Sequence, residues 1–306
     1  MLVDEGDPYS ALLVNKSINK LKARGIFGKI EKKIREGSSP ELKVLEVTVE
    51  EKPTGEMMAG AGVGTDGTSF MFSVSENNWL GRGVMFKSSL NLTTETISGG
   101  VSIQNPNYNF TGNSVFSSLF ISTADRTESS GFKSAKSSFN LGTEFEIYEG
   151  VYFSPSFGVA YEDIEVQSSA SASMQKMEGT FTNADFDYGI VVDKRNQTFK
   201  PTDGYRARFV QSLPLIQDSS SILNGLDLSV YRAISDDVIG SVKFYGRAIH
   251  GVDEDVRLTD RLKMPANKLR GFDTRKIGPK DGEGQAEAGE IVAMGLIIDS
   301  LQTSSG

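Results

Sequence analysis

The sequence predicts a mainly β protein: an antiparallel transmembrane β-barrel preceded by a small α+β segment. Three observations predict it. After Pro53, apolar and polar side chains alternate with a period of two, as in a strand with two different faces. About twelve such segments follow one another, each near the ~9–11 residues with which a tilted strand crosses a bilayer. Tight turns such as Glu149-Gly150 alternate with long polar loops such as residues 167–179.

The first fifty residues predict one helix and two strands. Between residues 8 and 24, apolar residues from Leu12 to Leu21 recur near helical spacing, and Gly25 stands where a helix ends. Residues 27–35 and 42–51 read as strands around a turn at 37–40. Because one helix on two strands buries little apolar area, we expect residues 1–53 to be part of a larger α+β domain. Residues 54–306 form the barrel part.

The strands are recognised by their two faces. In residues 138–148, Phe139 and Leu141 share one face, whereas Asn140 and Glu144 share the other. Residues 84–93, 151–162 and 238–248 alternate in the same way. Aromatic residues near the expected strand ends are candidates for interfacial girdles. They are Trp79, Tyr108, Tyr148, Tyr152, Tyr161 and Tyr188.

Alternation alone also fits a large soluble β domain, in which two sheets bury their apolar faces against each other. Two features favour the membrane barrel. The expected strands run near ten residues, whereas strands of soluble proteins average ~5–6. The polar face carries Gly, Ser, Asn and charged residues, as the lumen of a barrel does. The soluble alternative predicts extraction into buffer without detergent.

The composition excludes most enzyme chemistries. The 306 residues include no Cys and a single His, His250, so the chain lacks thiol nucleophiles, thiolate sites and His-cluster metal sites. A net charge of −8 does not suit nucleic acid, whose phosphates need clustered Lys and Arg. No G-x-S-x-G nucleophile elbow is present. We expect no enzyme activity, no cofactor, no metal and no nucleic-acid partner.

Two motifs narrow the assignment. Leu269-Arg270-Gly271-Phe272, followed by Ile277-Gly278-Pro279, resembles the loop signature of the BamA-type outer-membrane assembly proteins, the bacterial surface-antigen superfamily. Residues 199–206, which contain Pro201, Thr202, Asp203 and Gly204, are similar to that family's turn between two central barrel strands. Three further pieces follow family order: residues 9–27, residues 49–55 and residues 78–83. The resemblance covers essentially the whole chain.

The same resemblance implies the domain organisation. Residues 1–53 correspond to the C-terminal part of the last POTRA domain, and residues 54–306 to about three quarters of the barrel, with about twelve of sixteen strands. The family's terminal strand is not found, so we expect the chain to be an internal fragment of a longer protein. The resemblance places it in the bacterial outer membrane, with the POTRA part in the periplasm.

The function that the resemblance implies is folding and insertion of β-barrel proteins into the outer membrane. The first barrel strand, near residues 56–64, would template an incoming strand at a lateral seam. Gly60, Gly62 and Gly64 recur with period two, so pairing there should be weak and slippery. Alternatively, these glycines relieve crowding in a tightly curved strand. The implied partners are the lipid bilayer, unfolded β-barrel clients and accessory assembly lipoproteins.

In the family, the arginine of the loop motif pairs with groups inside the lumen. The resemblance gives this role to Arg270, with Gly271 allowing a tight turn and Phe272 packing beside it; the alternative is a solvated turn. Pro201-Thr202-Asp203-Gly204 specifies a turn and receives no chemistry. Arg206 and Arg208 share a face, on which Glu144, Glu146 or Asp187 are their expected partners, unless they simply line a wet interior.

Three other functions stay open. A two-partner-type secretion pore of the same superfamily would export one protein. A passive porin-like channel would conduct solute, but a porin begins directly with a barrel strand. A soluble β-rich adhesin remains if the resemblance is spurious.

Overall fold

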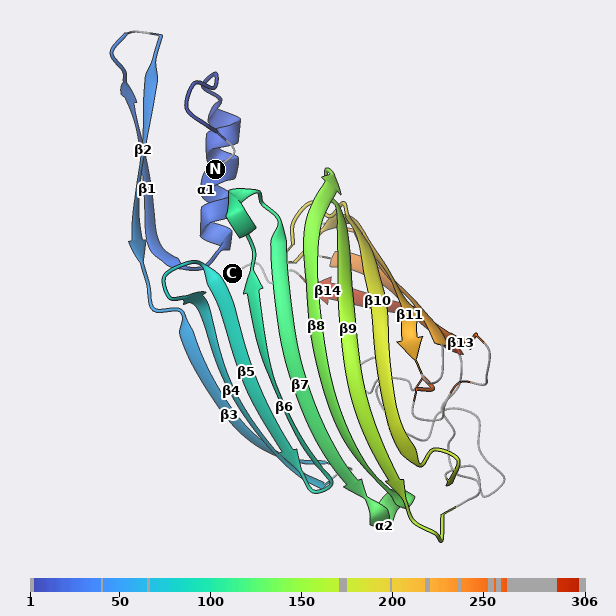
Figure 1. Ribbon diagram of the computed structural model, residues 1–306. Coiled ribbons are helices and arrows are strands. Elements are labelled where there is room, and N and C mark those ends of the chain that lie inside the picture. Colours follow the sequence, from blue (N-terminus) through green and yellow to red (C-terminus); the bar gives the residue numbers. More distant parts are fainter. Residues whose placement is uncertain are drawn as a thin grey trace.

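The computed structural model describes residues 3–39, 41–64, 67–170, 175–198, 200–217, 221–235, 238–252, 256, 260–262 and 291–302. An N-terminal unit of one helix and a two-stranded hairpin precedes one large antiparallel sheet (Figure 1). The unit projects from the end of the sheet at which the first sheet strand begins.

The helix of the N-terminal unit is α1 (Ala11–Ala23). Its N-cap is Ser10, whose hydroxyl accepts a hydrogen bond from the Leu13 N–H at 3.4 Å. Its end is marked by Gly25, which has a φ of +68° as a residue following a C-cap often does. Val14 and Ile18 are buried, so α1 covers one side of the hairpin β1 (Phe27–Glu36) and β2 (Lys43–Glu51). The predicted helix and two strands are confirmed to within three residues at each end.

Within the described ranges, the large sheet contains twelve strands in the order of the sequence, each antiparallel to the next. The strands are β3 (Gly55–Gly64), β4 (Gly67–Trp79), β5 (Val84–Thr93), β6 (Thr96–Asn105), β7 (Ser114–Arg126), β8 (Phe132–Tyr148), β9 (Val151–Val166), β10 (Gly179–Asp193), β11 (Asp203–Gln217), β12 (Ser221–Ala233), β13 (Val238–Gly251) and β14 (Ile291–Gln302). Two short helices lie in connections, η1 (Tyr108–Phe110) and α2 (Thr127–Ser130).

Several strands are longer than the sequence predicted. A strand was expected at residues 138–148, but β8 begins at Phe132 and has 17 residues; β9 has 16. The six added residues of β8 include Lys133 and Lys136, so they do not extend the apolar segment. The prediction stopped where the apolar alternation stopped, whereas backbone pairing with β7 and β9 continues beyond it.

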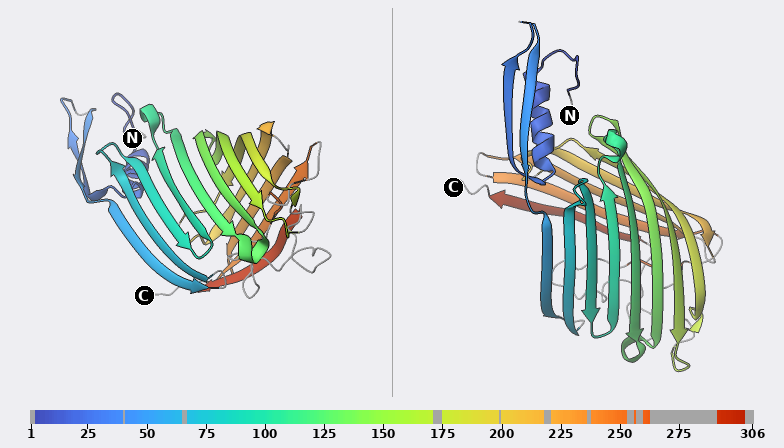
Figure 2. Two further views of the ribbon diagram at one scale, coloured as in Figure 1. Left: turned by 60° about the horizontal axis from the view of Figure 1, so that its bottom comes forward. Right: turned by 60° about the vertical axis from the view of Figure 1, so that its left-hand side comes forward.

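The sheet curls into an open trough (Figure 2). Its two faces are chemically different, as the register shows. The inner face carries the buried polar residues Ser73, Ser114 and Glu162. The outer face carries Phe139, 47% exposed, and residues of the same kind along the neighbouring strands. Because side chains converge on the concave side of a curved sheet, the polar face is the concave one.

The apolar outer face decides between the two β architectures considered from the sequence. In a soluble sandwich a second sheet covers the apolar face. Within the described part of the chain, no second large sheet exists, and large apolar side chains of the outer face stay exposed. Such a surface suits hydrocarbon. The described strands β3 and β14 are the two edges and do not pair with each other, so these residues form an open sheet.

Candidate functional site at the edge of the sheet

The candidate site is the free side of β3. This strand pairs with β4 along its length, from Gly55 opposite Glu76 to Gly64 opposite Gly67. In the ranges that the structure describes, no strand pairs with its other side. A free strand edge presents a row of backbone N–H and C=O groups, which can hydrogen-bond to a strand of another chain.

The three glycines singled out from the sequence lie on the inner face of β3. Gly60 is opposite Met71 and Gly62 is opposite Ser69. A Cβ atom at Gly60 would have no neighbour within 4 Å, whereas one at Gly62 would lie 3.3 Å from the Ser69 hydroxyl oxygen. Crowding therefore does not account for the glycine at position 60. The role of these glycines in a gate stays a prediction.

The outer face of the same strand is apolar and uncovered. Met57 is 73% exposed and Val63 is 87% exposed, the latter near the end of the strand that lies away from the N-terminal unit. The edge thus combines an apolar outer face, an inner face that carries Glu56 and Met58 near its start and only glycines after them, and a free row of backbone groups. This edge can pair with an amphipathic strand whose apolar face points outward, as the apolar faces of the sheet strands do.

Ion pairs lie on the inner face and at one end of the sheet. Asp227 on β12 accepts a hydrogen bond from the Arg247 guanidinium on β13 at 2.7 Å. At the end nearer the N-terminal unit, Arg195 donates two hydrogen bonds to Asp193, at 2.8 and 2.6 Å. These bonds raise the pKa of the Arg195 guanidinium, which lies in the connection after β10, so it stays charged.

Arg206 lies near a carboxylate that was not among the partners considered from the sequence. Its Nε atom lies 3.8 Å from an Asp193 carboxylate oxygen. Glu144 instead accepts a hydrogen bond from the Ser154 hydroxyl at 2.8 Å. Asp193 was missed because alternation gives the face of a residue but not the register. Only the pairing of Asp193 with Arg206 across β10 and β11 brings these charges together.

The tetrapeptide 201–204 lies at the end of the connection between β10 and β11 and extends into the start of β11. Pro201 and Thr202 belong to the connection, whereas Asp203 and Gly204 already begin β11. The connection is held by Asn196, whose side chain donates to Thr202 Oγ1 at 2.6 Å. Gly204 has a φ of +97°, and a Cβ there would lie 2.2 Å from the Lys194 carbonyl oxygen. Its glycine is required by backbone conformation and by close approach.

The loop motif lies outside the described residues. This applies to Leu269, Arg270, Gly271, Phe272, Ile277, Gly278 and Pro279. Their assignment therefore stays a prediction from the resemblance.

The aromatic residues expected near strand ends lie there only in part, and their role as an interfacial girdle stays a prediction. Trp79 ends β4 and stacks on Phe86 with ring centroids 4.8 Å apart, and Tyr148 ends β8. Tyr188, in contrast, lies inside β10, five residues before its end. It belongs to a series of ring contacts on the outer face that includes Phe153, Phe186 and Phe209.

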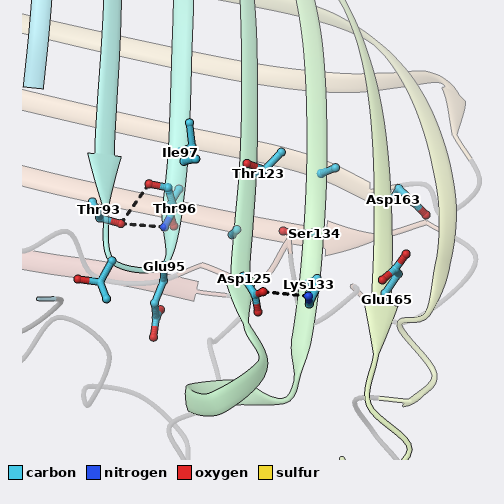
Figure 3. A pocket seen from close by; sticks show the side chains of 13 residues that line it. Thr93, Glu95, Thr96, Ile97, Thr123, Asp125, Lys133, Ser134, Asp163 and Glu165 are labelled. Atoms are coloured by element: carbon cyan, nitrogen blue, oxygen red, sulfur yellow. Dashed lines mark hydrogen bonds and ion pairs between the residues drawn. The ribbon is translucent and has the colours of Figure 1, made fainter. Parts of the chain in front are cut away.

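A hollow of about 390 Å³ lies at the end of the sheet that is far from the N-terminal unit (Figure 3). Figure 3 shows Asp125 and Lys133 side by side at its rim; their oxygen and nitrogen atoms are 2.9 Å apart. Glu95, Asp163 and Glu165 also line it. These charges mark the end of the apolar outer face on β6 to β9.

Two features are absent from the described residues. No helix among them combines the length and the apolar character needed to cross a membrane. No group of three or more His, Asp and Glu side chains in these ranges is placed to hold a metal ion.

A curved antiparallel sheet with an apolar outer face and a polar inner face defines the class of outer-membrane β-barrel proteins. The comparison with family models agrees: the Omp85 superfamily domain matches residues 78–297, well over half of the chain. The chain belongs to the Omp85 superfamily. The resemblance inferred from the sequence is thereby confirmed.

Individual relatives point the same way. The chain is 24% identical over 292 residues to the outer membrane protein assembly factor BamA of Neorickettsia risticii (strain Illinois), a match that covers 92% of the chain and 39% of that protein. Its fold is similar to the crystal structure of BamA from Haemophilus ducreyi lacking POTRA domains 1–3, with a TM-score of 0.70, 18% identity, and coverage of 97% of this chain and 62% of the other.

A second similar structure is CdiB from Acinetobacter baumannii, with a TM-score of 0.56, 13% identity, and coverage of 89% and 53%. At these identities the two structures show the fold alone. The chain spans about two fifths of the length of the curated relative.

Proposed function

We propose that this chain takes part in the folding and insertion of β-barrel proteins into the bacterial outer membrane. The observation that carries the proposal is the first sheet strand β3, which has glycine at three alternate positions of its inner face and an exposed apolar outer face. An unfolded client would add a strand to this edge by backbone hydrogen bonds, while lipid covers the apolar face of that strand. The similarity to an outer membrane protein assembly factor supports this reading.

The proposal includes an orientation and a set of partners. The N-terminal unit is part of a POTRA domain and lies in the periplasm, so that β3 begins at the periplasmic side. The partners are the bilayer, unfolded clients and accessory lipoproteins. By resemblance to the family's loop motif at residues 269–272 and 277–279, the proposal assigns to Arg270 the arginine that pairs with groups inside the lumen.

The test reconstitutes the natural full-length protein in lipid vesicles and follows an unfolded client barrel as it becomes heat-modifiable on a gel. We expect clear acceleration over empty vesicles. Gly60→Val should slow insertion, because it removes the backbone freedom of glycine and adds a side chain to the inner face of β3, whereas position 61 already has a Cβ atom. Ala61→Val, on the opposite face of β3, is the matched control and should retain the rate. Absence of acceleration by the unaltered protein would refute the proposal.

A secretion pore of the same superfamily is the second candidate. The observation in its favour is the polar inner face with its ion pairs, which suits a water-filled passage. The same vesicles distinguish the two functions. A steady ion conductance without client insertion would favour the pore.

A further inference from the structure

The turn between β4 and β5 connects the N-terminal unit to the sheet. Asn78, near the end of β4, is its central residue. The Asn78 side-chain oxygen accepts a hydrogen bond from the Gly83 N–H at 2.7 Å and so closes the turn. The side-chain nitrogen donates to a carboxylate oxygen of Glu51, the last residue of β2, at 3.3 Å. One amide group therefore holds the turn and the hairpin at once.

Glu76 links the same turn to the start of the edge strand. Its carboxylate accepts hydrogen bonds from the Asn78 N–H at 2.8 Å and from the hydroxyl of Thr54, the residue directly before β3. A Cβ atom at Gly55 would lie 3.1 Å from the other Glu76 oxygen, so the carboxylate lies over the first residue of β3. Movements of the turn and of the beginning of β3 are thus coupled.

The end of α1 contacts the same place. Arg24, the C-cap of the helix, lies against Gly83, where a Cβ would be 3.3 Å from its guanidinium nitrogen. The Lys52 N–H donates to the Ile26 carbonyl at 3.0 Å, which ties the chain entering the sheet to the chain leaving the helix. Helix, hairpin, turn and edge strand therefore meet around Asn78.

We propose that Asn78 and Glu76 are positioning residues that couple the orientation of the N-terminal unit to the edge strand β3. The inference deepens the proposed function and rests on it. The Asn78–Glu51 hydrogen bond is long and exposed, so its net strength is modest. The contact between the N-terminal unit and the turn can therefore break and form again. When the Asn78–Glu51 bond is made, the turn is fixed to the hairpin, and the contacts of Glu76 with Asn78, Thr54 and Gly55 transmit that position to the start of β3.

Three variants separate the Asn78–Glu51 contact, called the joint below, from the Asn78–Gly83 hydrogen bond that closes the turn. In Asn78→Asp, the new carboxylate still accepts from the Gly83 N–H, but it faces Glu51 and repels it. In the double variant Asn78→Asp with Glu51→Gln, the glutamine amide donates to Asp, so the joint reforms with its donor and acceptor exchanged. Glu51→Gln alone keeps an acceptor for Asn78 and should behave as the unaltered protein. Glu50→Gln, the neighbouring residue, is the matched control.

The measurement uses the full-length protein in lipid vesicles, with heat-modifiability as proof of a folded barrel. Residues 1–306 contain no Cys, so in a full-length background without other Cys, cysteines introduced at Ser38 and Asn113 can carry two spin labels, one on the hairpin tip and one in a connection at the same end of the sheet. We expect a broader label distance distribution in Asn78→Asp and a client insertion rate lower by about threefold, as the loss of one modest hydrogen bond implies. The double variant should restore both.

An unchanged distance distribution in Asn78→Asp, or a double variant that does not restore it, overturns the inference. If Asn78→Asp fails to fold, Glu51→Ala removes the same bond from the hairpin side and gives the same expectation. Failure of the proposed function looks different. In that case the unaltered protein does not accelerate insertion, although the label distance still responds to the variants.

Discussion

Gly225 on β12 positions a charged side chain by having none of its own. A Cβ atom at this position would lie 2.7 Å from a Val210 methyl group and 2.8 Å from both Cδ and Nε of Arg247. The Arg247 side chain passes over the glycine, donates to Asp227 at 2.7 Å and lies 4.4 Å from the centroid of the Tyr245 ring. The absence of a side chain at position 225 lets the pair form in this geometry.

Gly225→Ala is expected to lower the free energy of unfolding by about 1–3 kcal/mol, because the added methyl overpacks the inner face and displaces Arg247 from Asp227. Chemical unfolding in lipid vesicles, followed by Trp fluorescence, measures it. Gly60→Ala is the control: with no neighbour within 4 Å, it should leave stability unchanged or raise it by less than about 1 kcal/mol. Equal effects of the two substitutions would contradict the argument.

Single residues also show what the sequence could and could not predict. The alternation placed Arg206 on the inner face correctly, but its partner Asp193 needed the register between β10 and β11. The glycine of the 201–204 tetrapeptide was predicted from turn chemistry, yet its reason is a φ of +97° at a strand start. Local chemistry predicts conformational demands, whereas pair identities depend on register.

On the outer face, a row of hydrogen-bonded polar side chains runs across β10, β11 and β12. The Tyr188 hydroxyl donates to the Gln211 amide oxygen at 2.7 Å, and the Gln211 amide nitrogen donates to the Asn224 oxygen at 2.6 Å. The register sets these residues directly opposite one another. In hydrocarbon, a polar side chain without a partner is costly, so a register slip that separates them is disfavoured.

Gln211→Ala should destabilise the protein by about 1 kcal/mol, because it leaves the Tyr188 hydroxyl and the Asn224 amide without their partner on an apolar face. The triple variant Tyr188→Phe, Gln211→Leu, Asn224→Leu removes every member and should be close to neutral. Unfolding in vesicles compares the two. A triple variant that loses more stability than Gln211→Ala would show that these hydrogen bonds give a net stabilisation, beyond offsetting the cost of placing their polar groups in hydrocarbon.

The existence of the strands could be predicted better than their ends. Residues 84–93 match β5 in both bounds, since apolar alternation and pairing end together there. For β8, polar alternation from Phe132 to Ser138 carried no apolar signal, although pairing with β7 extends to Phe132. Backbone hydrogen bonds end where neighbouring strands end, and a single segment does not contain that information.

At the scale of the whole molecule, the direction of the apolar face determines where the protein resides. Phe139 and Phe120 lie on neighbouring strands, β8 and β7, but on opposite faces, since Phe139 is paired with Leu119 and Phe120 with Ser138. Trp79, the only tryptophan of the chain, ends β4 on the side of the N-terminal unit and is 42% exposed. A tryptophan at a strand end suits the membrane–water interface.

Tryptophan at these positions allows the depth of the sheet in the membrane to be measured. In vesicles, Trp79 fluorescence should be quenched more by lipids brominated near the headgroup than by lipids brominated deep in the acyl chain. In a Trp79→Phe background, Phe139→Trp should reverse that order because its ring faces the middle of the apolar band. Phe120→Trp, the matched inner-face control, should be quenched by neither lipid. Equal quenching of the Phe139→Trp and Phe120→Trp variants, or a protein that stays in buffer without detergent, would mean that the apolar face does not meet lipid, and the soluble β architecture would replace the barrel.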